Sequence, residues 1–241
     1  MKKTILSSIM LVQLASLSAQ QQGTITYERK IDVHRRMEDE QMKAMVPQFR
    51  TTKHVLLFSD SISVYKAVKE DEAPDPFDQG NGGARVMIRI GPGENSVIYK
   101  NFSKQKIEEQ TELADKNYII DDTLHALPWK LTEETKTILS HNCKKATLVT
   151  KTGNNVTAWY AEDIVTPAGP ENYGGLPGAV LAIDMNDGEI VFTATSIDKK
   201  INNKDLAEPK DGKHITRVDF QKKMEELFGP PGPGGRRMIR M

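Results

Sequence analysis

Apolar and polar residues alternate along much of the chain, and this alternation predicts β-strands. Residues 24–33 (TITYERKIDV) place apolar side chains at alternate positions, which is typical of a strand with one buried face. Further runs of this kind, separated by a few polar or glycine residues, indicate hairpins. The predicted hairpins cover 54–68, 85–101, 143–163 and 179–198, and single strands are predicted near 104–113 and 117–121.

The hairpin at 179–198 has the clearest pattern. Its first strand begins with the apolar run Ala179-Val180-Leu181-Ala182-Ile183, which predicts a buried strand. Asn186-Asp187-Gly188 then supplies residues that tolerate the positive φ angles of a tight turn.

Two segments have helical patterns. Residues 35–46 (RRMEDEQMKAMV) have helix-forming composition, and Pro47 would end that helix. Near the C-terminus, Phe220, Met224, Leu227 and Phe228 share one helical face. Thr216 and Asp219 stand at the spacing of a capping box, and Gly229 would end this second helix.

These elements predict a mainly β protein. Many short strands joined by nearby turns favour a single curved antiparallel sheet, half-barrel or sandwich-like, built from hairpins. The C-terminal amphipathic helix would cover one face of the sheet or one open end. Residues 20–228 are predicted to form one domain, with an acidic, turn-rich loop at 69–84 and a disordered Pro/Gly/Arg tail at 229–241.

The first 19 residues have the pattern of a secretory signal peptide. Lys2 and Lys3 precede an apolar run over 5–14, and Ala19 suits the position before a cleavage site. The apolar run is too short to cross a bilayer. We therefore expect an exported protein, periplasmic or extracellular, in a bacterial envelope, with no transmembrane span in the mature chain.

Charge and cysteine content narrow the possibilities further. The chain has 33 Lys and Arg residues and 33 Asp and Glu residues, so it lacks the positive charge of a nucleic-acid-binding protein. Cys143 is the one cysteine, so the fold cannot contain an internal disulfide and must depend on its apolar core.

A dense glycine and proline segment precedes the hairpin at 179–198. Gly174, Gly175 and Gly178 permit backbone conformations closed to other residues, and Pro177 fixes its own φ angle. Leu176 is predicted to be an apolar anchor in the core. The segment would turn the chain sharply and deliver it into the buried strand.

Around this segment the chain resembles the GLPGLI family of exported bacterial proteins. Residues 175–180 read Gly-Leu-Pro-Gly-Ala-Val, with Ala and Val where the signature has Leu and Ile. The resemblance extends to Cys143-Lys144-Lys145-Ala146, Ala158-Trp159-Tyr160, Gly169-Pro170 and residues 192–198. It implies a mostly β envelope protein, a companion of outer-membrane machinery, with no established reaction and therefore no catalytic residues to carry over.

Catalytic motifs are absent from the sequence. No nucleophile elbow, zinc-protease motif, phosphate-binding loop or dinucleotide fingerprint occurs, so we assign no catalytic residues and favour a protein that is not an enzyme. Cys143 is a possible reactive thiol, because His141 two residues away would share its face of a strand. The alternative is a small buried side chain, the common fate of a free cysteine.

A metal site is the second chemical possibility. His34, Met37, Met42 and Met45 lie close in sequence, and imidazole with thioether ligands suits copper(I). The alternative is a methionine-lined helix face that packs on the sheet.

The resulting hypothesis is an exported accessory or binding protein without a cofactor. It would hold an apolar ligand or a partner from the outer-membrane machinery in a groove of the curved sheet. The aromatic residues expected to line that groove are Trp129, Trp159, Tyr160 and Tyr173. The rival hypothesis is a periplasmic copper-handling protein that uses His34 and the nearby methionines.

Overall fold

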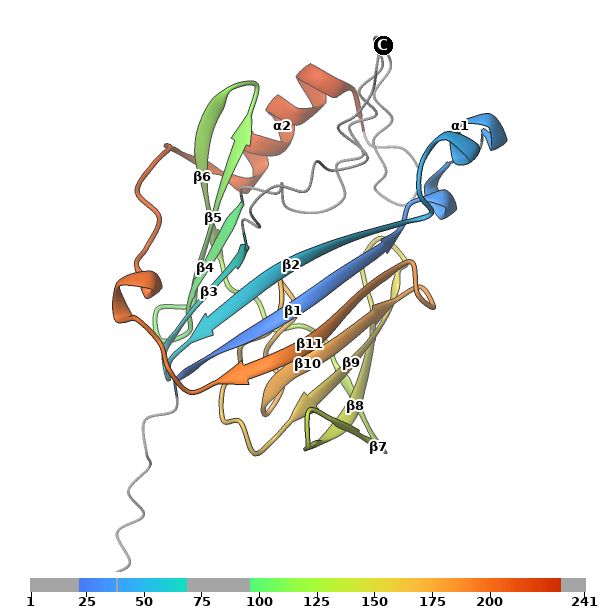
Figure 1. Ribbon diagram of the computed structural model, residues 1–241. Helices are drawn as coiled ribbons and strands as arrows, with labels where there is room; N and C mark the ends of the chain where they lie inside the picture. The colour runs from blue at the N-terminus through green and yellow to red at the C-terminus, as the bar shows by residue number, and fades with distance from the viewer. Residues whose placement is uncertain (1–21, 38, 69–95, 231–241) are drawn as a thin grey trace, which may run out of the picture.

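Twelve β-strands form one sheet in the part of the chain that the computed structural model describes, residues 22–37, 39–68 and 96–230 (Figure 1). The predictions for 1–19, for 69–84, for the first strand and turn of the 85–101 hairpin and for most of the tail lie outside these residues. The strands are β1 (Gly23–Asp32), β2 (Phe49–Phe58), β3 (Ile62–Ala67), β4 (Val97–Asn101), β5 (Lys106–Leu113), β6 (Lys116–Thr123), β7 (Lys130–Ile138), β8 (His141–Val149), β9 (Asn155–Ala161), β10 (Ala179–Met185), β11 (Ile190–Asp198) and β12 (Lys213–Thr216).

The strand order is β12-β6-β5-β4-β3-β2-β1-β11-β10-β9-β8-β7. Strands β2 to β6 form one meander and β7 to β11 form another. Strand β1 joins them, because it pairs with β2 on one side and β11 on the other. The sheet is open, with β12 and β7 at its edges, and this confirms the predicted fold class. One pair departs from the expected antiparallel pattern, because β12 runs parallel to β6.

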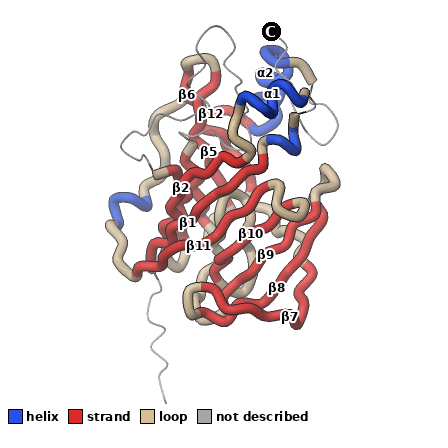
Figure 2. Tube along the Cα trace, turned by 45° about the vertical axis from the view of Figure 1, so that its right-hand side comes forward, coloured by secondary structure: helices blue, strands red, loops and turns tan. Residues whose placement is uncertain are grey.

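The sheet is strongly curved, and its inner face carries the main core (Figures 1 and 2). We call the face that bears Ile25 and Tyr27 of β1 the inner face and the opposite one the outer face. The main core cluster includes Tyr65 and Ile98 from the first meander and Ile183 from the second. The two meanders therefore share one core on either side of β1.

A smaller apolar cluster lies on the outer face. Leu57, Val64 and Tyr99 are buried there, and Ile201 and Leu206 pack against them. Leu206 ends the short helix η2 (Asn203–Leu206), within the connection between β11 and β12. We call residues 199–212 the strap, since they cross this face to reach β12 at the edge of the sheet.

The prediction of one continuous helix at 35–46 is wrong, because the chain forms two short helices there. The chain forms a short helix η1 (His34–Arg36) and then α1 (Glu40–Met45). Met37 is extended, and Asp39 is the N-cap of α1, with its carboxylate accepting from the Gln41 N–H at 2.8 Å. An Asp at this position therefore starts a new helix in place of continuing the first.

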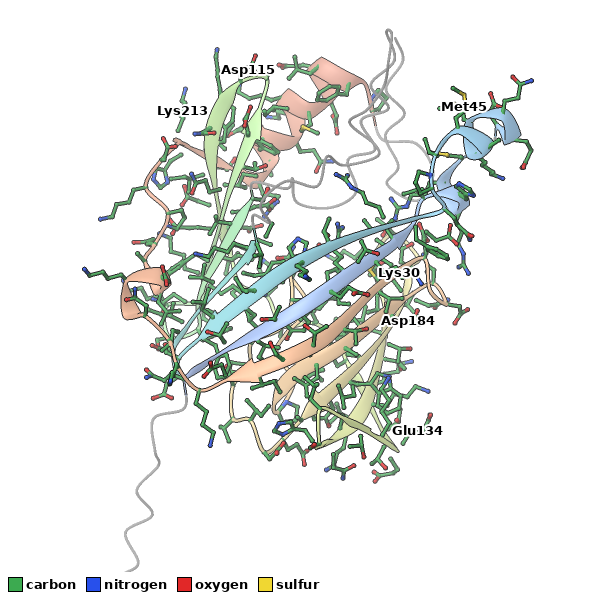
Figure 3. The ribbon with its side chains drawn as sticks, in the orientation of Figure 1. Lys30, Met45, Asp115, Glu134, Asp184 and Lys213 are labelled. Carbon is green, nitrogen blue, oxygen red and sulfur yellow. The ribbon has the colours of Figure 1, made fainter. Side chains whose placement is uncertain are left out.

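Because the two helices are separate, Met37, Met42 and Met45 do not share one helical face that packs on the sheet. Met45 projects from α1 and is 83% exposed (Figure 3). None of the residues in α1 is buried.

The C-terminal helix is confirmed as α2 (Arg217–Phe228). The Thr216 hydroxyl accepts from the Asp219 N–H, and Gly229 ends the helix with a φ of 76°. Phe220 meets Tyr118 edge-to-face with ring centroids 5.8 Å apart, so α2 covers the end of β6 on the inner face. Within the described residues, no helix is long and apolar enough to span a membrane.

Candidate functional site on the inner face of the sheet

Charged and polar side chains interrupt the apolar inner face at strands β1 to β4. We call them the inner polar cluster: Arg29, Thr52, His54, Tyr65, Lys100 and Glu171. Thr52, His54 and Leu56 share one face of β2, where Arg29 stands opposite Thr52. Tyr65 stands opposite Leu56, and Lys100 stands opposite Ser63, so the same face continues across β3 and β4. Glu171 comes from the loop between β9 and β10.

Glu171 is the centre of the cluster. Its carboxylate Oε1 lies 3.1 Å from Arg29 Nε, and both side chains are nearly buried. Its backbone carbonyl accepts a hydrogen bond from the Lys100 ammonium. Arg29 also lies over the Phe192 ring, 5.6 Å from its centroid. One loop residue therefore connects β1 and β4, which are separated in the sheet by β2 and β3.

The glycine and proline segment holds this loop against the sheet. The Gly175 N–H donates to the Pro167 carbonyl at 2.8 Å, with Gly175 at a φ of 80°. A Cβ on Gly178 would lie 2.1 Å from the Ala161 carbonyl oxygen. Leu176 is 3% exposed within the main core, which confirms its predicted anchoring role. The Tyr27 hydroxyl donates to the Val180 carbonyl at 2.5 Å, so β1 also fixes the strand that follows.

His54 and Tyr65 form a stacked pair beside Arg29. Their ring centroids are 5.1 Å apart with an interplanar angle of 2°. Among the described residues, the Tyr65 hydroxyl and the Thr52 hydroxyl have no hydrogen-bond partner although both oxygens are buried. A buried hydroxyl without a partner carries a desolvation cost that the fold alone does not explain.

Burial shifts the pKa values of the cluster toward uncharged forms. Burial lowers the pKa of His54 to about 4, and the Arg29 charge adds to this shift. Burial also lowers the pKa of Lys100 to about 8, against the attraction of Glu171. Burial raises the pKa of the Glu171 carboxyl even though Arg29 opposes the shift. Such a group of perturbed residues is a feature of functional sites.

The charged side chains continue across the inner face toward α2. Arg217, the first residue of α2, binds Glu109 of β5 at 2.8 Å and Asp122 of β6 at 3.3 Å. The Glu109 charge in turn raises the pKa of Glu171. The inner face therefore carries charges from β1 to the helix that covers its far end.

The buried imidazole gives a prediction about acid stability. Between pH 6.5 and about 4 the unfolded chain takes up a proton at His54 and the folded chain does not, so stability falls as the pH falls. Each pH unit in this interval lowers the free energy of unfolding by about 1.4 kcal/mol, so the full loss is about 3 kcal/mol. His54→Phe keeps the stacking ring and removes the titration. Urea unfolding from pH 7.5 to 4.5 should give a shallower acid slope for this variant, and equal slopes would contradict the prediction.

The four aromatic residues expected to line a groove have different surroundings. Trp129 donates to the Gly174 carbonyl at 2.9 Å, and the Tyr173 hydroxyl contacts Met185 Sδ at 3.3 Å, so both support the glycine and proline segment. Trp159 lies under the Lys136 ammonium, 4.4 Å from its ring centroid, and Tyr160 is buried. Two of the four therefore border the loop that carries Glu171.

Cys143 is buried in the main core. Its thiol donates to the His141 carbonyl at 3.6 Å, and burial raises the pKa of the thiol. The His141 ring is paired with Asp163 instead, at 2.6 Å. These surroundings favour the small buried side chain over the reactive thiol.

The hypothesis that His34 and its neighbouring methionines bind copper stays a prediction. Nε2 of His34 lies 3.0 Å from the Val46 carbonyl. Met37 packs against the main core, whereas Met42 and Met45 are exposed.

Sequence reasoning missed the inner polar cluster, yet a signal for it exists. Arg29 occupies the apolar phase of its strand, between Tyr27 and Ile31. Lys100 likewise follows Ile98 by two positions, and His54 precedes Leu56 by two. A charged residue in the buried phase of a strand predicts a buried partner, although it does not say which one.

Comparison with known proteins places this chain in a family. Residues 91–221, more than half of the chain, match the family model described as N-glycanase peptide, N-terminal domain. The chain belongs to this family. The matched residues include Lys100 and Glu171, and they extend into α2. No curated protein matches the chain significantly.

Solved structures support the fold of this N-glycanase N-terminal-domain family member. The structure of PNGF-II in the P21 space group aligns with a TM-score of 0.57 and 17% identity, over 84% of this chain and 33% of PNGF-II. The C2 form aligns with the same TM-score, 18% identity, and 84% and 32% coverage. The chain therefore spans about a third of the length of PNGF-II, and at this identity the likeness shows the fold alone.

Proposed function

We propose that this chain is an exported, non-catalytic accessory domain whose inner polar cluster binds the polar part of a glycan or glycopeptide. The observation that carries the proposal is the Tyr65 hydroxyl, which is buried on the inner face and lacks a hydrogen-bond partner among the described residues. A ligand hydroxyl or amide at this position would remove the cost of leaving it unpaired.

The chemistry of the cluster supports a polar ligand. Arg29 and Lys100 supply donors, Glu171 supplies acceptor oxygens, and the stacked rings of His54 and Tyr65 offer flat surfaces. His54 keeps part of its surface exposed, so solvent reaches the edge of the cluster. These features favour a polar ligand over the apolar one that the aromatic residues suggested.

The family to which the chain belongs supports a glycan or glycopeptide as the class of ligand. Its description names an N-glycanase, and the PNGF-II structures share the fold. Sugar hydroxyls and the amide of a glycosylated asparagine would suit the mixture of donors and acceptors in the cluster. The signal-peptide pattern and the GLPGLI resemblance, with its envelope location, remain predictions consistent with an exported protein that meets such ligands.

Calorimetry with an N-linked high-mannose glycopeptide tests the proposal, using the same peptide without the glycan for comparison. We expect the glycopeptide to bind and the bare peptide to bind more weakly. Tyr65→Phe should weaken binding about 10-fold, because one hydrogen bond of about 1.4 kcal/mol is lost. Its stability should stay within about 0.5 kcal/mol of the unmodified protein, since no hydrogen bond within the described residues is removed.

Tyr27→Phe is the matched control, because its hydroxyl is already bound to the Val180 carbonyl. It should lower stability and leave glycopeptide affinity unchanged. Absence of glycopeptide binding, or equal loss of affinity in the two variants, would refute the proposal. Mass spectrometry of the same samples checks the non-catalytic part, which release of the glycan by the purified protein would refute.

A further inference from the structure

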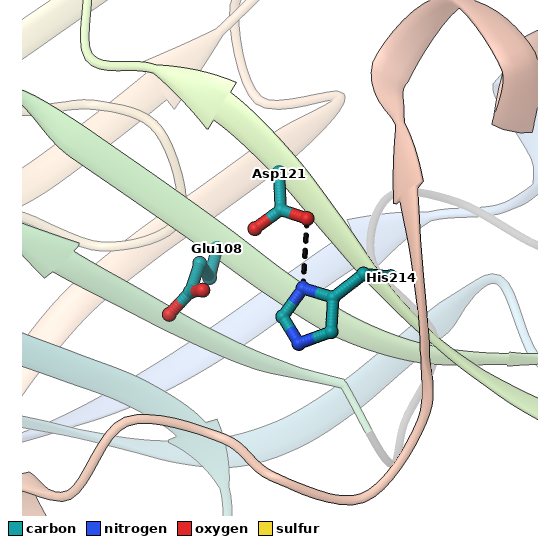
Figure 4. Close-up of side chains that lie close together, drawn as sticks. All are labelled: Glu108, Asp121 and His214. Carbon is teal, nitrogen blue, oxygen red and sulfur yellow. Dashed lines mark hydrogen bonds and ion pairs between the residues drawn. The ribbon is translucent and has the colours of Figure 1, made fainter.

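Three side chains with metal-binding groups lie together on the outer face, at the edge of the sheet. Glu108 of β5 stands directly opposite Asp121 of β6. His214 of β12 lies beside them (Figure 4). None of them belongs to the inner polar cluster, which lies on the other face.

The distances between these groups suit a single ion. His214 Nδ1 lies 2.8 Å from Asp121 Oδ2. One ligand atom from each of the three residues can be chosen so that all lie within 4.8 Å of one another. Ligands bound at about 2.0–2.2 Å in a tetrahedral site lie about 3.3–3.6 Å apart, so binding would draw these side chains together by up to about 1.5 Å.

Glu108 gives an independent indication of a ligand. Its side chain is only 1% exposed. Oε1 is paired with the Lys106 ammonium at 2.6 Å, whereas Oε2 is buried and has no hydrogen-bond partner among the described residues. A buried carboxylate oxygen is costly unless it is hydrogen-bonded or bound to a cation.

The local charge balance also favours a cation. Glu208 of the strap lies 2.9 Å from Lys106, so one ammonium serves two carboxylates. Asp121 adds a third acidic group directly across from Glu108. Like charges at opposed positions of a strand pair are destabilising. Burial raises the pKa of the Glu108 carboxyl, the Lys106 ammonium opposes this shift and the Glu208 carboxylate adds to it, so a bound cation would take the place of a proton here.

We propose that Glu108, Asp121 and His214 bind a divalent cation, with Zn²⁺ the best fit. Two carboxylates and one imidazole form a three-residue ligand set that leaves a further position for water. Imidazole favours zinc over calcium or magnesium, which prefer all-oxygen sites. This site is separate from His34 and its methionines, and it does not depend on the proposed glycan binding.

A bound cation would fasten β12 to the sheet. This strand has only four residues and lies at the edge, paired with β6 alone. Residue His214 lies two positions before Thr216, the N-cap of α2. The ion would therefore fix the start of α2. The Lys106 ammonium, which pairs with both Glu108 and Glu208, connects the site to the strap.

Zinc titration of the purified protein against a chromophoric competing chelator tests this site. We expect one saturable equivalent of Zn²⁺ and a higher melting temperature in its presence. His214→Gln and Asp121→Asn should each weaken binding at least about 10-fold, since even indirect partners of metal ligands cost about 10- to 100-fold. His214 is 60% exposed, so its variant is expected to fold even if the Asp121 variant does not.

His141→Gln is the matched control. His141 pairs with Asp163 at 2.6 Å much as His214 pairs with Asp121, but among the described residues this pair has no third metal-binding group. The control should bind Zn²⁺ like the unmodified protein and keep its thermal shift. No saturable binding, unchanged binding in His214→Gln, or an equal loss in His141→Gln would overturn the site.

Discussion

Gly178→Ala is expected to destabilise the protein by about 3 kcal/mol or more, or to prevent folding. A Cβ at this position would lie 2.1 Å from the Ala161 carbonyl oxygen and 2.8 Å from Glu162 Cα. Both are backbone atoms, so no side-chain rotation relieves the clash. Relief would require β9 and the start of β10 to separate, where Ala179 pairs with Ala161. Urea unfolding monitored by circular dichroism would measure the loss.

Gly153→Ala separates this steric effect from a general intolerance of glycine replacement. Gly153 has a φ of 84°, and nothing lies within 4 Å of the position its Cβ would take. Its replacement by alanine should lower the free energy of unfolding by only about 1 kcal/mol, because backbone strain is the one cost. Equal losses in the two variants would show that the close approach at Gly178 does not determine the stability of this region.

The parts of the fold that the sequence predicted are those with local determinants. The turn at Asn186, Asp187 and Gly188 has φ angles of 51°, 54° and 91°, as its residue types required. The buried strand after Pro177 follows from an apolar run whose side chains all enter the core. The end of α2 follows from Gly229, which adopts a positive φ angle.

Two strands were missed because their pairing does not depend on their own pattern. Strand β7 (KLTEETKTI) has no buried residue, so its sequence shows no apolar phase. It is recruited at the sheet edge by hydrogen bonding to β8. Strand β12 has four residues and pairs in parallel with β6, a contact between segments far apart in the sequence. Neither strand has the periodicity on which strand prediction depends.

The candidate site was missed for a related reason. Arg29 and Lys100 stand in the buried phase of their strands, but the sequence does not say which residue each one meets. Arg29, Lys100 and Glu171 come from β1, β4 and a loop, and the register of the sheet brings them together. The sequence predicted that the glycine and proline segment turns the chain sharply. It did not predict that Glu171, just before this segment, would lie beside Arg29, because that position depends on the path of the folded loop. The local sequence indicates that such a charge needs a buried partner, but the identity of a partner far away in the chain depends on the fold.

Glu171→Gln is expected to lower the free energy of unfolding by about 3–5 kcal/mol, because it leaves the buried Arg29 charge with less compensation. The amide keeps the size of the side chain, so the loss measures charge and not packing. Urea unfolding at pH 7 provides the measurement. Glu162→Gln is the matched control, because Glu162 pairs with Lys144 at 2.8 Å where both side chains are exposed. Glu162→Gln should lower the free energy of unfolding by at most about 1 kcal/mol.

The double variant Arg29→Met with Glu171→Gln should be more stable than Glu171→Gln alone. Burial raises the pKa of Glu171 even with Arg29 beside it, so the cost of removing this carboxylate from water exceeds the attraction between the two charges. A buried ion pair of this kind contributes little net stability, yet losing one partner is costly because the other stays buried. Removing both charges removes that cost, and methionine keeps much of the contact of Arg29 with Phe192. If the two single changes simply added, Arg29 and Glu171 would not be energetically coupled, and the loop would be held by its other contacts, such as those of Lys100 and Trp129 with its backbone carbonyls.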